Sequence, residues 1–343
     1  MNVTVSNESL EFSLVNISLS HSFLRAWFGL TVSLSIISSF LCILLIASIV
    51  LTQHKWRKGA TVLIVHLLCL DLFACAVTFP AVTIDVFLMF NGRVLHSLCP
   101  LDAFLPIAVW YTNCWATALL ALNRFVAILF PSFYRYLTTR RALMLTMLTS
   151  WLIGSSAYAP ALFGVGARFV VRPPYNLCTV VPFHDHAWYA MVSVGLGVPV
   201  ILEGTAYLVL FIVLTSRPAG VDSQAAGGER AKKRLRRKIN VARMLCLSYL
   251  SCLVCYAVVP LLTGMFGVNA AGESMEIGLL AVTLELFGYM IAPMVYLALN
   301  EEYRRGARRI LCGRLRGMRV ADAELFTITN ENTAKTRVDP DTL

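Results

Sequence analysis

Four carboxylates lie within long apolar runs of the sequence, where an ionised side chain is hardest to accommodate. They are Asp71, Asp85, Glu203 and Glu285. If these runs cross a membrane, such a carboxylate is costly and is expected to have a function, with Asp71 the strongest candidate for a switch residue. Glu203 and Glu285 fit ligand contacts and equally fit hydrogen bonds that hold two helices together.

A positively charged residue closes another apolar run. The stretch from Ala103 to Leu122 carries no charge, and Asn123 and Arg124 follow it directly. A helix of about 20 apolar residues crosses the ~30 Å hydrocarbon layer of a bilayer. We therefore expect a membrane span that has Cys99 near one end and Arg124 at the other.

The composition of the chain agrees with a membrane protein. Hydrophobic residues make up 58% of the 343 residues and charged residues only 14%, whereas a soluble domain has about 25% charged residues. The formal net charge of +10 suggests nucleic acid at first sight, but in a membrane protein excess Lys and Arg mark the cytoplasmic side. We expect no nucleic-acid partner.

Seven apolar runs are long enough to span a membrane. An open sheet cannot expose its edges to lipid, and the runs are too long and too continuously apolar for barrel strands, so we predict an all-α bundle of seven transmembrane helices. The runs are Leu30–Leu51, Ala60–Phe90, Ala103–Leu122, Ala142–Phe163, Ala187–Ser216, Met244–Val268 and Ile277–Asn300.

The charges of the connecting segments predict the orientation. Basic residues gather after the first, third, fifth and seventh runs, while the alternate loops hold only Arg93, Arg168 and Arg172. The positive-inside rule then places the N-terminus outside the plasma membrane and the C-terminus in the cytoplasm. The polar leading tail agrees, because it carries three glycosylation sequons and no cleavable signal peptide. The acceptors are Asn2, Asn7 and Asn16.

The cysteines divide by location. Cys99 and Cys178 fall at the predicted outer side, where an oxidising environment favours a disulfide between them. Most other cysteines lie within spans, where cysteine acts as a small apolar residue, and none has metal-ligand spacing. Cys312 follows a basic amphipathic stretch and is a palmitoylation candidate, with an unmodified thiol as the alternative.

The segments after the fifth and seventh runs are basic. Arg217–Lys238 is a flexible loop entering a basic helix, and it suits either attraction to anionic lipids or docking of a cytosolic partner. Residues 301–313 predict an amphipathic helix on the inner membrane surface. The domain organisation is then a tail (1–24), the bundle (25–300), this helix (301–313) and a disordered tail (314–343).

Several motifs together resemble the rhodopsin-like (class A) G-protein-coupled receptors. Cys99 lies 25 positions before Arg124, Pro199 is followed eight positions later by Tyr207, and span seven contains Pro293-Met294-Val295-Tyr296. Pro131, Tyr134, Trp151 and Pro260 add to the pattern. The resemblance covers roughly residues 26–312.

Within this class, four stretches are similar to the insect Moody and trapped-in-endoderm receptors and the vertebrate medium-chain fatty acid receptor. They are NRFVAILFPSFY, FPAVTIDVFL, ALFGVGARFVVRPPYNLCTVVPF and VARMLCLSYLSCLVCYAVVPLL.

The resemblance implies a receptor, not an enzyme, without a cofactor. An extracellular ligand would shift a pre-existing equilibrium towards outward movement of span six, which opens a cytoplasmic cleft for a heterotrimeric G protein. Arrestin and membrane lipids are the further partners that it suggests. The implied activation-switch residues are Asn123, Arg124, Phe125, Tyr207, Pro293 and Tyr296.

The chain departs from the family pattern beside Arg124. The acidic residue that precedes this arginine in the family is Asn123 here, and Asn240 stands where many members carry a second acid. Two opposite charges at ~4 Å attract by about 4 kcal/mol at an effective dielectric of ~20, before desolvation. A neutral amide lacks that attraction, so we expect elevated basal signalling unless other packing holds the resting state.

The family's sodium site is also altered. Asp71 would anchor the ion, and its partners correspond to Asn113, Gly288 and Ala292. Because glycine and alanine side chains supply no oxygen ligand, we expect Asp71 to remain a switch residue with Asn113 while sodium affinity is lost. No metal site is predicted elsewhere.

The expected ligand cavity is mostly apolar with a few polar side chains, as ligand sites commonly are. The absence of an aspartate at the level of Pro106 disfavours an amine ligand, and the absence of a lysine from span seven excludes an opsin. A lipid or fatty-acid-like ligand is favoured, with Arg168 or Arg172 pairing a carboxylate, although both can equally face water. The other predicted lining residues are Asp85, Pro106, Trp110, Val258, Leu262 and Glu285.

A multi-span transporter is the alternative function. Transporters usually show paired halves with Gly- or Pro-broken spans at matching places, and the sequence has no such internal repeat. Proton-dependent uptake in liposomes, independent of any G protein, would favour transport.

Overall fold

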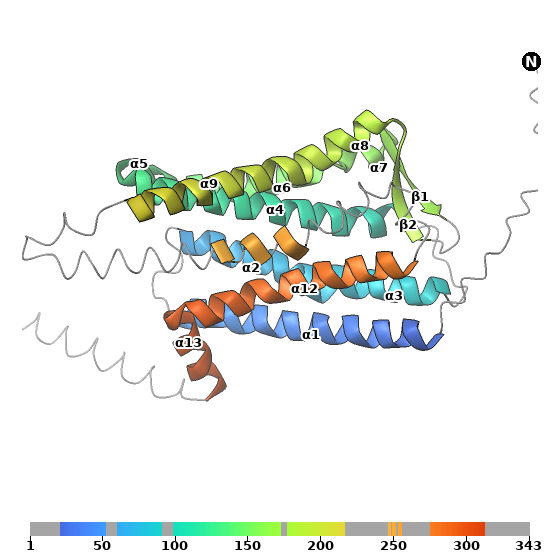
Figure 1. Ribbon diagram of the computed structural model, residues 1–343, viewed down its shortest axis with the longest axis horizontal. Coiled ribbons are helices and arrows are strands. Elements are labelled where there is room, and N and C mark those ends of the chain that lie inside the picture. The colour runs from blue at the N-terminus through green and yellow to red at the C-terminus, as the bar shows by residue number, and fades with distance from the viewer. Residues whose placement is uncertain are drawn as a thin grey trace, which may run out of the picture.

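The computed structural model describes residues 21–52, 60–90, 99–172, 177–216 and 275–312, together with 246, 247, 249–251 and 253–255 in the predicted sixth span. Within these ranges the apolar runs fold into helices that lie side by side along a common direction (Figure 1). The predicted glycosylation sites Asn2, Asn7 and Asn16, and the predicted ligand residues Val258 and Leu262, lie outside the described residues.

The elements follow the order of the predicted spans. Span one is α1, span two is α2 continued by η1 and α3, span three is α4, and span four is α6. Span five is α8 continued by η3 and α9, and span seven is α12. The bounds are α1 (His21–Thr52), α2 (Ala60–Phe73), η1 (Ala74–Thr78), α3 (Phe79–Phe90), α4 (Cys99–Leu129), α5 (Pro131–Leu137), α6 (Arg140–Ser156), α7 (Ala159–Leu162), β1 (Ala167–Arg172), β2 (Leu177–Pro182), α8 (Asp185–Val192), η3 (Ser193–Gly197), α9 (Val198–Ser216), α12 (Met275–Leu299) and α13 (Glu301–Leu311).

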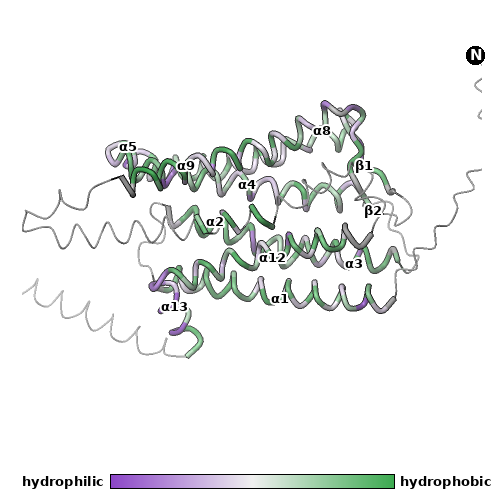
Figure 2. Tube along the Cα trace, viewed as in Figure 1, coloured by the Kyte–Doolittle hydropathy of each residue, from purple (hydrophilic) through white to green (hydrophobic). Residues whose placement is uncertain are grey.

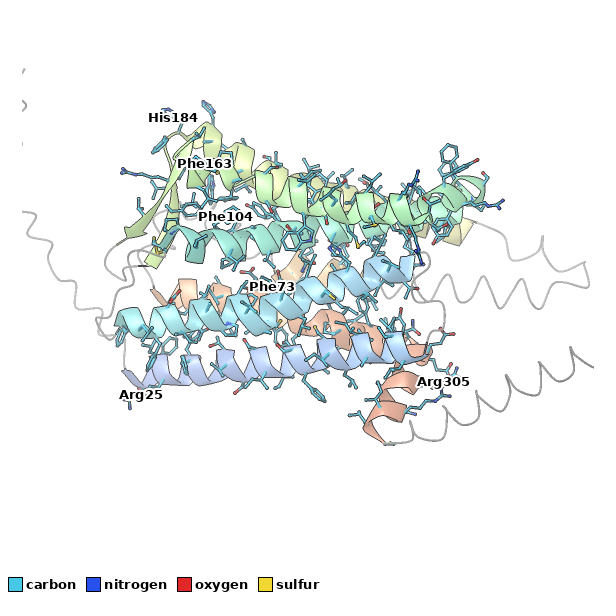
Figure 3. All side chains as sticks on the ribbon, turned by 180° about the vertical axis from the view of Figure 1, so that it is seen from behind. Arg25, Phe73, Phe104, Phe163, His184 and Arg305 are labelled. Atoms are coloured by element: carbon cyan, nitrogen blue, oxygen red, sulfur yellow. A yellow bond between two sulfur atoms is a disulfide. The ribbon has the colours of Figure 1, made fainter. Side chains whose placement is uncertain are left out.

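The two ends of the bundle differ. Strands β1 and β2 form an antiparallel hairpin at one end, and α5 and α13 lie at the other (Figure 1). Figure 3 places His184 and Phe163 at the hairpin end and Arg305 at the α13 end. The helices between these ends are mainly hydrophobic, whereas α13 is strongly hydrophilic (Figure 2).

The surface of the bundle is more apolar than that of a soluble protein, and some polar side chains are buried. Large apolar side chains such as Ile36, Leu145 and Phe211 are more than half exposed, while Asp71 and Asn113 are buried. This distribution fits a bundle surrounded by lipid, because lipid solvates apolar side chains and leaves polar ones to be satisfied inside. Among the described residues, five helices are long and apolar enough to cross a membrane.

Two prolines explain the two π-helical segments. Pro80 and Pro199 each lack a backbone N–H, so each leaves a carbonyl of the preceding turn without its usual donor. The π segments η1 and η3 lie directly before these prolines, where an extra residue per turn re-forms the hydrogen-bond ladder. Span three behaves differently, because α4 continues through Pro106 as one helix.

Side-chain hydrogen bonds connect elements that are far apart in sequence. The Trp27 indole N–H of α1 donates to the Leu279 carbonyl at 3.1 Å and to the Thr283 hydroxyl at 3.0 Å in α12. The Ser48 hydroxyl donates to the Tyr303 carbonyl of α13 at 2.8 Å. These bonds pack the first, seventh and amphipathic helices together.

The amphipathic helix matches its predicted character. The Asn300 side chain caps α13 by accepting from the Glu302 backbone N–H at 3.0 Å. Tyr303 and Ala307 are buried against the bundle. The four arginines of α13 are exposed.

Three local features differ from the sequence prediction. Helix α1 begins at His21, before the predicted start of the bundle at residue 25. Helix α4 extends from Cys99 to Leu129, past both ends of its apolar run, and Asn123 beyond the second end of that run is buried. The hairpin of β1 and β2 was not predicted, and its register pairs Ala167 with Pro182.

Gly195 of η3 provides a test of this packing. A Cβ at position 195 would overlap the ring of Tyr111, whereas a Cβ at Gly197 would meet nothing nearer than 4.0 Å. Overpacking of this kind costs roughly 1–3 kcal/mol. We predict that Gly195→Ala lowers the thermal unfolding temperature of the purified protein and that Gly197→Ala does not. Equal unfolding temperatures for the two variants would contradict the close approach of α4 and η3.

Candidate functional site

The predicted switch residues gather at the α13 end of the bundle. Tyr207 of α9 and Tyr296 of α12 are buried in one apolar cluster, and Phe125 of α4 packs against it. Arg124 and Tyr296 are both electrostatic neighbours of the Tyr207 hydroxyl. Helices α4, α9 and α12 therefore bring one cation and two phenols together, an arrangement whose contacts can be exchanged when a helix moves. Pro293 is buried in α12, one turn before Tyr296.

Asn123 occupies the place next to Arg124 without pairing its charge. Its amide is 6% exposed. Within the described part of the chain, neither the Asn123 Oδ1 atom nor the Arg124 Nε atom has a hydrogen-bond partner. The described residues also hold no carboxylate in an ion pair with Arg124. The charge of Arg124 is thus held by packing rather than by a salt bridge.

A second polar group crosses the middle of the bundle. The Asn113 Nδ2 atom of α4 donates to the Asp71 Oδ1 atom of α2 at 2.9 Å, and Asp71 is 2% exposed. The Asn113 side chain also lies next to the Tyr289 hydroxyl of α12. One connected set of polar groups therefore links three helices, as expected where water is excluded and polar groups need protein partners.

This group is a poor fit for a sodium ion. Asp71 Oδ2 and Asn113 Oδ1 lack hydrogen-bond partners among the described residues and are two available oxygens. Gly288 and Ala292, which line the corresponding part of α12, have no side-chain oxygen. Hard cations require several oxygen ligands, so the donor set is too small.

The predicted disulfide is confirmed. Cys99 at the start of α4 and Cys178 in β2 are bonded, with Cα atoms 5.3 Å apart. The bond fixes the hairpin to the end of span three. Cys312 is exposed directly after α13, and its palmitoylation stays a prediction, as does glycosylation of the leading tail.

A cavity of about 120 Å³ lies between the second, third and seventh spans. Two of the predicted ligand residues, Pro106 and Glu285, line this cavity, and its lining is mostly apolar. This volume is below the roughly 300 Å³ of a drug-sized pocket and resembles a cavity that holds a benzene-sized group. The lining residues are Thr78, Phe79, Val82, Pro106, Val282, Glu285 and Tyr289.

Among the predicted ligand residues whose side chains the structure describes, Asp85, Trp110 and Arg168 do not line this cavity. Asp85 is half-buried in α3, and Trp110 packs its ring against Tyr111 with centroids 5.1 Å apart. Arg168 is exposed on β1, opposite Val181 of β2. Arg172 is placed in the same strand by its backbone.

Part of the polar interior was predicted and part was missed. Glu203 of α9, which the sequence offered as a ligand contact or a contact between helices, is 7% exposed, and its carboxyl lies next to the Thr117 side chain of α4. Thr78 and Tyr289 were not assigned to the cavity, because no feature of the sequence marks them.

The fold and this set of interior residues define a seven-transmembrane receptor. The family model of the 7 transmembrane receptor (rhodopsin family) matches residues 43–296. The chain therefore belongs to the rhodopsin family of seven-transmembrane receptors, with an all-α bundle and an amphipathic helix after the last span. The crystal structure of squid rhodopsin superposes with a TM-score of 0.71 at 14% identity, covering 86% of this chain and 87% of that chain.

Similar curated proteins are distant. The chain is 24% identical to the short-wave-sensitive opsin 1 of Mus musculus over 229 residues, which is 63% of this chain and 62% of the opsin. It is 25% identical to the Homo sapiens G-protein coupled receptor 84 over 108 residues, 32% of this chain and 27% of that receptor. It is 22% identical to the Cavia porcellus neuromedin-K receptor over 223 residues, covering 62% and 49% of the two chains. The matches span less than two thirds of the length of these three relatives.

The poor sodium fit gives a direct prediction. We expect the unfolding temperature of the purified receptor to be the same in NaCl and in choline chloride of equal concentration. An ion that binds only the folded state would raise it. Ala292→Asn adds an amide oxygen beside Asp71 and should introduce a sodium-specific rise. A sodium-specific rise already present in the wild type would contradict the donor-set argument.

Proposed function

We propose that the protein is a receptor that couples an extracellular ligand to a heterotrimeric G protein. The observation that carries this proposal is the grouping of Arg124, Tyr207 and Tyr296 where α4, α9 and α12 meet at the α13 end. Ligand binding at the hairpin end shifts the equilibrium towards a form in which span six has moved outward. The cleft opened in this way receives the G protein, and arrestin is a second candidate partner.

The proposed location is the plasma membrane, with the hairpin end outside. Among the described basic residues, those of α5 and α13 lie at the α13 end of the bundle (Figure 1), and a disulfide between Cys99 and Cys178 is favoured by an oxidising exterior. The transporter alternative is not favoured, because the family match is to receptors.

We further propose that the receptor signals appreciably without ligand. An acid beside Arg124 would add a charge pair to the resting form, and Asn123 cannot supply one. The absence of an ion pair at Arg124 within the described residues supports this view.

The test is ligand-free signalling in cells, measured with a panel of G-protein sensors at equal surface expression. Asn123→Asp should lower the basal signal several-fold, because about 1 kcal/mol of added resting-state stability changes the ratio of the two forms about fivefold. Arg124→Ala should reduce it to background. An unchanged signal in Asn123→Asp would refute the role assigned to the neutral amide.

We propose a lipid or fatty-acid-like ligand that reaches the cavity between the second, third and seventh spans. Phe79, Val82 and Val282 provide an apolar lining, to which Glu285 adds a carboxyl group. The resemblance of four sequence stretches to a receptor group that includes the medium-chain fatty acid receptor is the sequence argument for this ligand class. Although opsins are among the relatives, α12 contains no lysine, so a retinal Schiff base cannot form there.

The ligand proposal is tested with decanoic acid and decanol as probes. At least one should raise signalling in the wild type, and Val282→Phe should weaken that response about tenfold or more, because it fills the cavity. Leu280→Phe is the matched control, since Leu280 lies on the same helix and is 55% exposed. Failure of both probes on the wild type, or an equal response in both variants, would contradict the proposal. The alcohol separates a need for a carboxylate from a need for the apolar chain.

A further inference from the structure

The described part of span six has one face turned outward and another turned towards α9. Leu247, Leu250 and Val254 are 47%, 48% and 68% exposed, and their spacing places them on one helical stripe. Tyr249 is instead packed against the buried cluster that contains Tyr207. The orientation of span six relative to α9 is therefore defined at this level.

Tyr249 fits onto α9 at a glycine. A Cβ at Gly204 would lie 2.7 Å from the Tyr249 Oη atom and 3.4 Å from its Cζ atom. The hydroxyl donates to the Val200 carbonyl at 3.3 Å, which is long for an O–H···O bond and therefore weak. The tyrosine is accommodated because position 204 has no side chain.

The same tyrosine contacts the switch region. Its ring centroid lies 5.9 Å from that of Tyr207, one turn further along α9. Glu203, which lies next to Thr117 of α4, is an electrostatic neighbour of Tyr249 and of Cys246 in span six. Spans three, five and six thus meet around Tyr249.

We infer that Tyr249, seated on Gly204 and against Tyr207, holds span six in the resting position in place of the charge pair that Asn123 cannot form. This inference rests on the proposed function. Outward movement of span six must lift Tyr249 from Gly204, break its bond to the Val200 carbonyl and separate it from Tyr207. Tyr207 is then free to turn towards Arg124. Contact between a tyrosine and a glycine replaces electrostatic attraction as the resting-state constraint.

The geometry specifies a double-mutant cycle. Gly204→Ala introduces a better helix former into α9 but places a methyl group against the Tyr249 hydroxyl. Tyr249→Phe removes that oxygen, after which the nearest ring atom is at an ordinary contact distance. The methyl group should therefore be harmful only when the hydroxyl is present.

Two readouts are used for the four variants of the cycle. The first is ligand-free signalling in cells at equal surface expression. The second is hydrogen–deuterium exchange of peptides covering residues 244–255 in the purified receptor, which requires no G protein. Gly29→Ala is the control, because a Cβ there would meet nothing within 4 Å.

We expect Gly204→Ala to raise both the basal signal and the exchange roughly threefold or more, since contacting residues couple strongly enough to shift a two-state ratio by that factor. Tyr249→Phe should cause only a small rise, and adding Gly204→Ala to it should change little further. Gly29→Ala should match the wild type.

The outcomes separate this inference from the proposed function. The role of Tyr249 is overturned if Gly204→Ala shows the same hydrogen–deuterium exchange as the wild type. It is also overturned if Gly204→Ala raises the exchange equally in the Tyr249 and Tyr249→Phe backgrounds. Coupled changes in exchange without any G-protein signal in any variant support the role of Tyr249 and overturn the proposed function. Changes in exchange with an unaltered basal signal show that the contact does not hold the resting state, and they overturn the inference.

Discussion

The hydrogen bond between Asn113 and Asp71 is the constraint on which the interior of the bundle depends. Both side chains are buried at a depth where water cannot satisfy them. Their bond joins α2 to α4, and the contact of Asn113 with Tyr289 extends the connection to α12. Three helices are thereby fixed at one level, with the small cavity on the hairpin side of this level and the Arg124 region on the other.

The α13 end of the bundle is held together by the fit of side chains more than by charge pairs. Arg124 lies beside a neutral amide, and within the described residues it has no ion pair. Aromatic contacts remain, as in the pair of Tyr207 and Tyr249, and these contacts depend on a close approach at Gly204. Such contacts are expected to favour the resting form over the active form less strongly than a buried ion pair would. The proposed basal signalling therefore depends on the side chain at position 123.

Most of the helices could be predicted from the sequence, because apolar runs of membrane-spanning length leave little choice of structure. The ends of the helices could not be predicted, since α4 extends beyond its apolar run at both ends and burial of a polar residue such as Asn123 depends on tertiary packing. The π-helical segments η1 and η3 arise because the backbone hydrogen bonds rearrange before Pro80 and Pro199. The hydrophobic pattern of the sequence does not predict this rearrangement. The disulfide of Cys99 and Cys178 was predictable from sidedness alone, and it is confirmed. The isolated position of Glu203 in an apolar run indicated a buried contact, but its neighbour Thr117 could not be named from the sequence. The fit of Tyr249 on Gly204 depends on tertiary packing, for which a single sequence carries no signal.

The measurement that tests the central claim most directly is guanine-nucleotide exchange on purified heterotrimeric G proteins, catalysed by the purified receptor in lipid nanodiscs without ligand. A receptor that carries the neutral Asn123 beside Arg124 should accelerate exchange on at least one G-protein subtype above the rate seen with empty nanodiscs. It should lose that acceleration in Arg124→Ala. Exchange at the empty-nanodisc rate for every subtype, with a receptor shown to be folded by its unfolding transition, would contradict the claim.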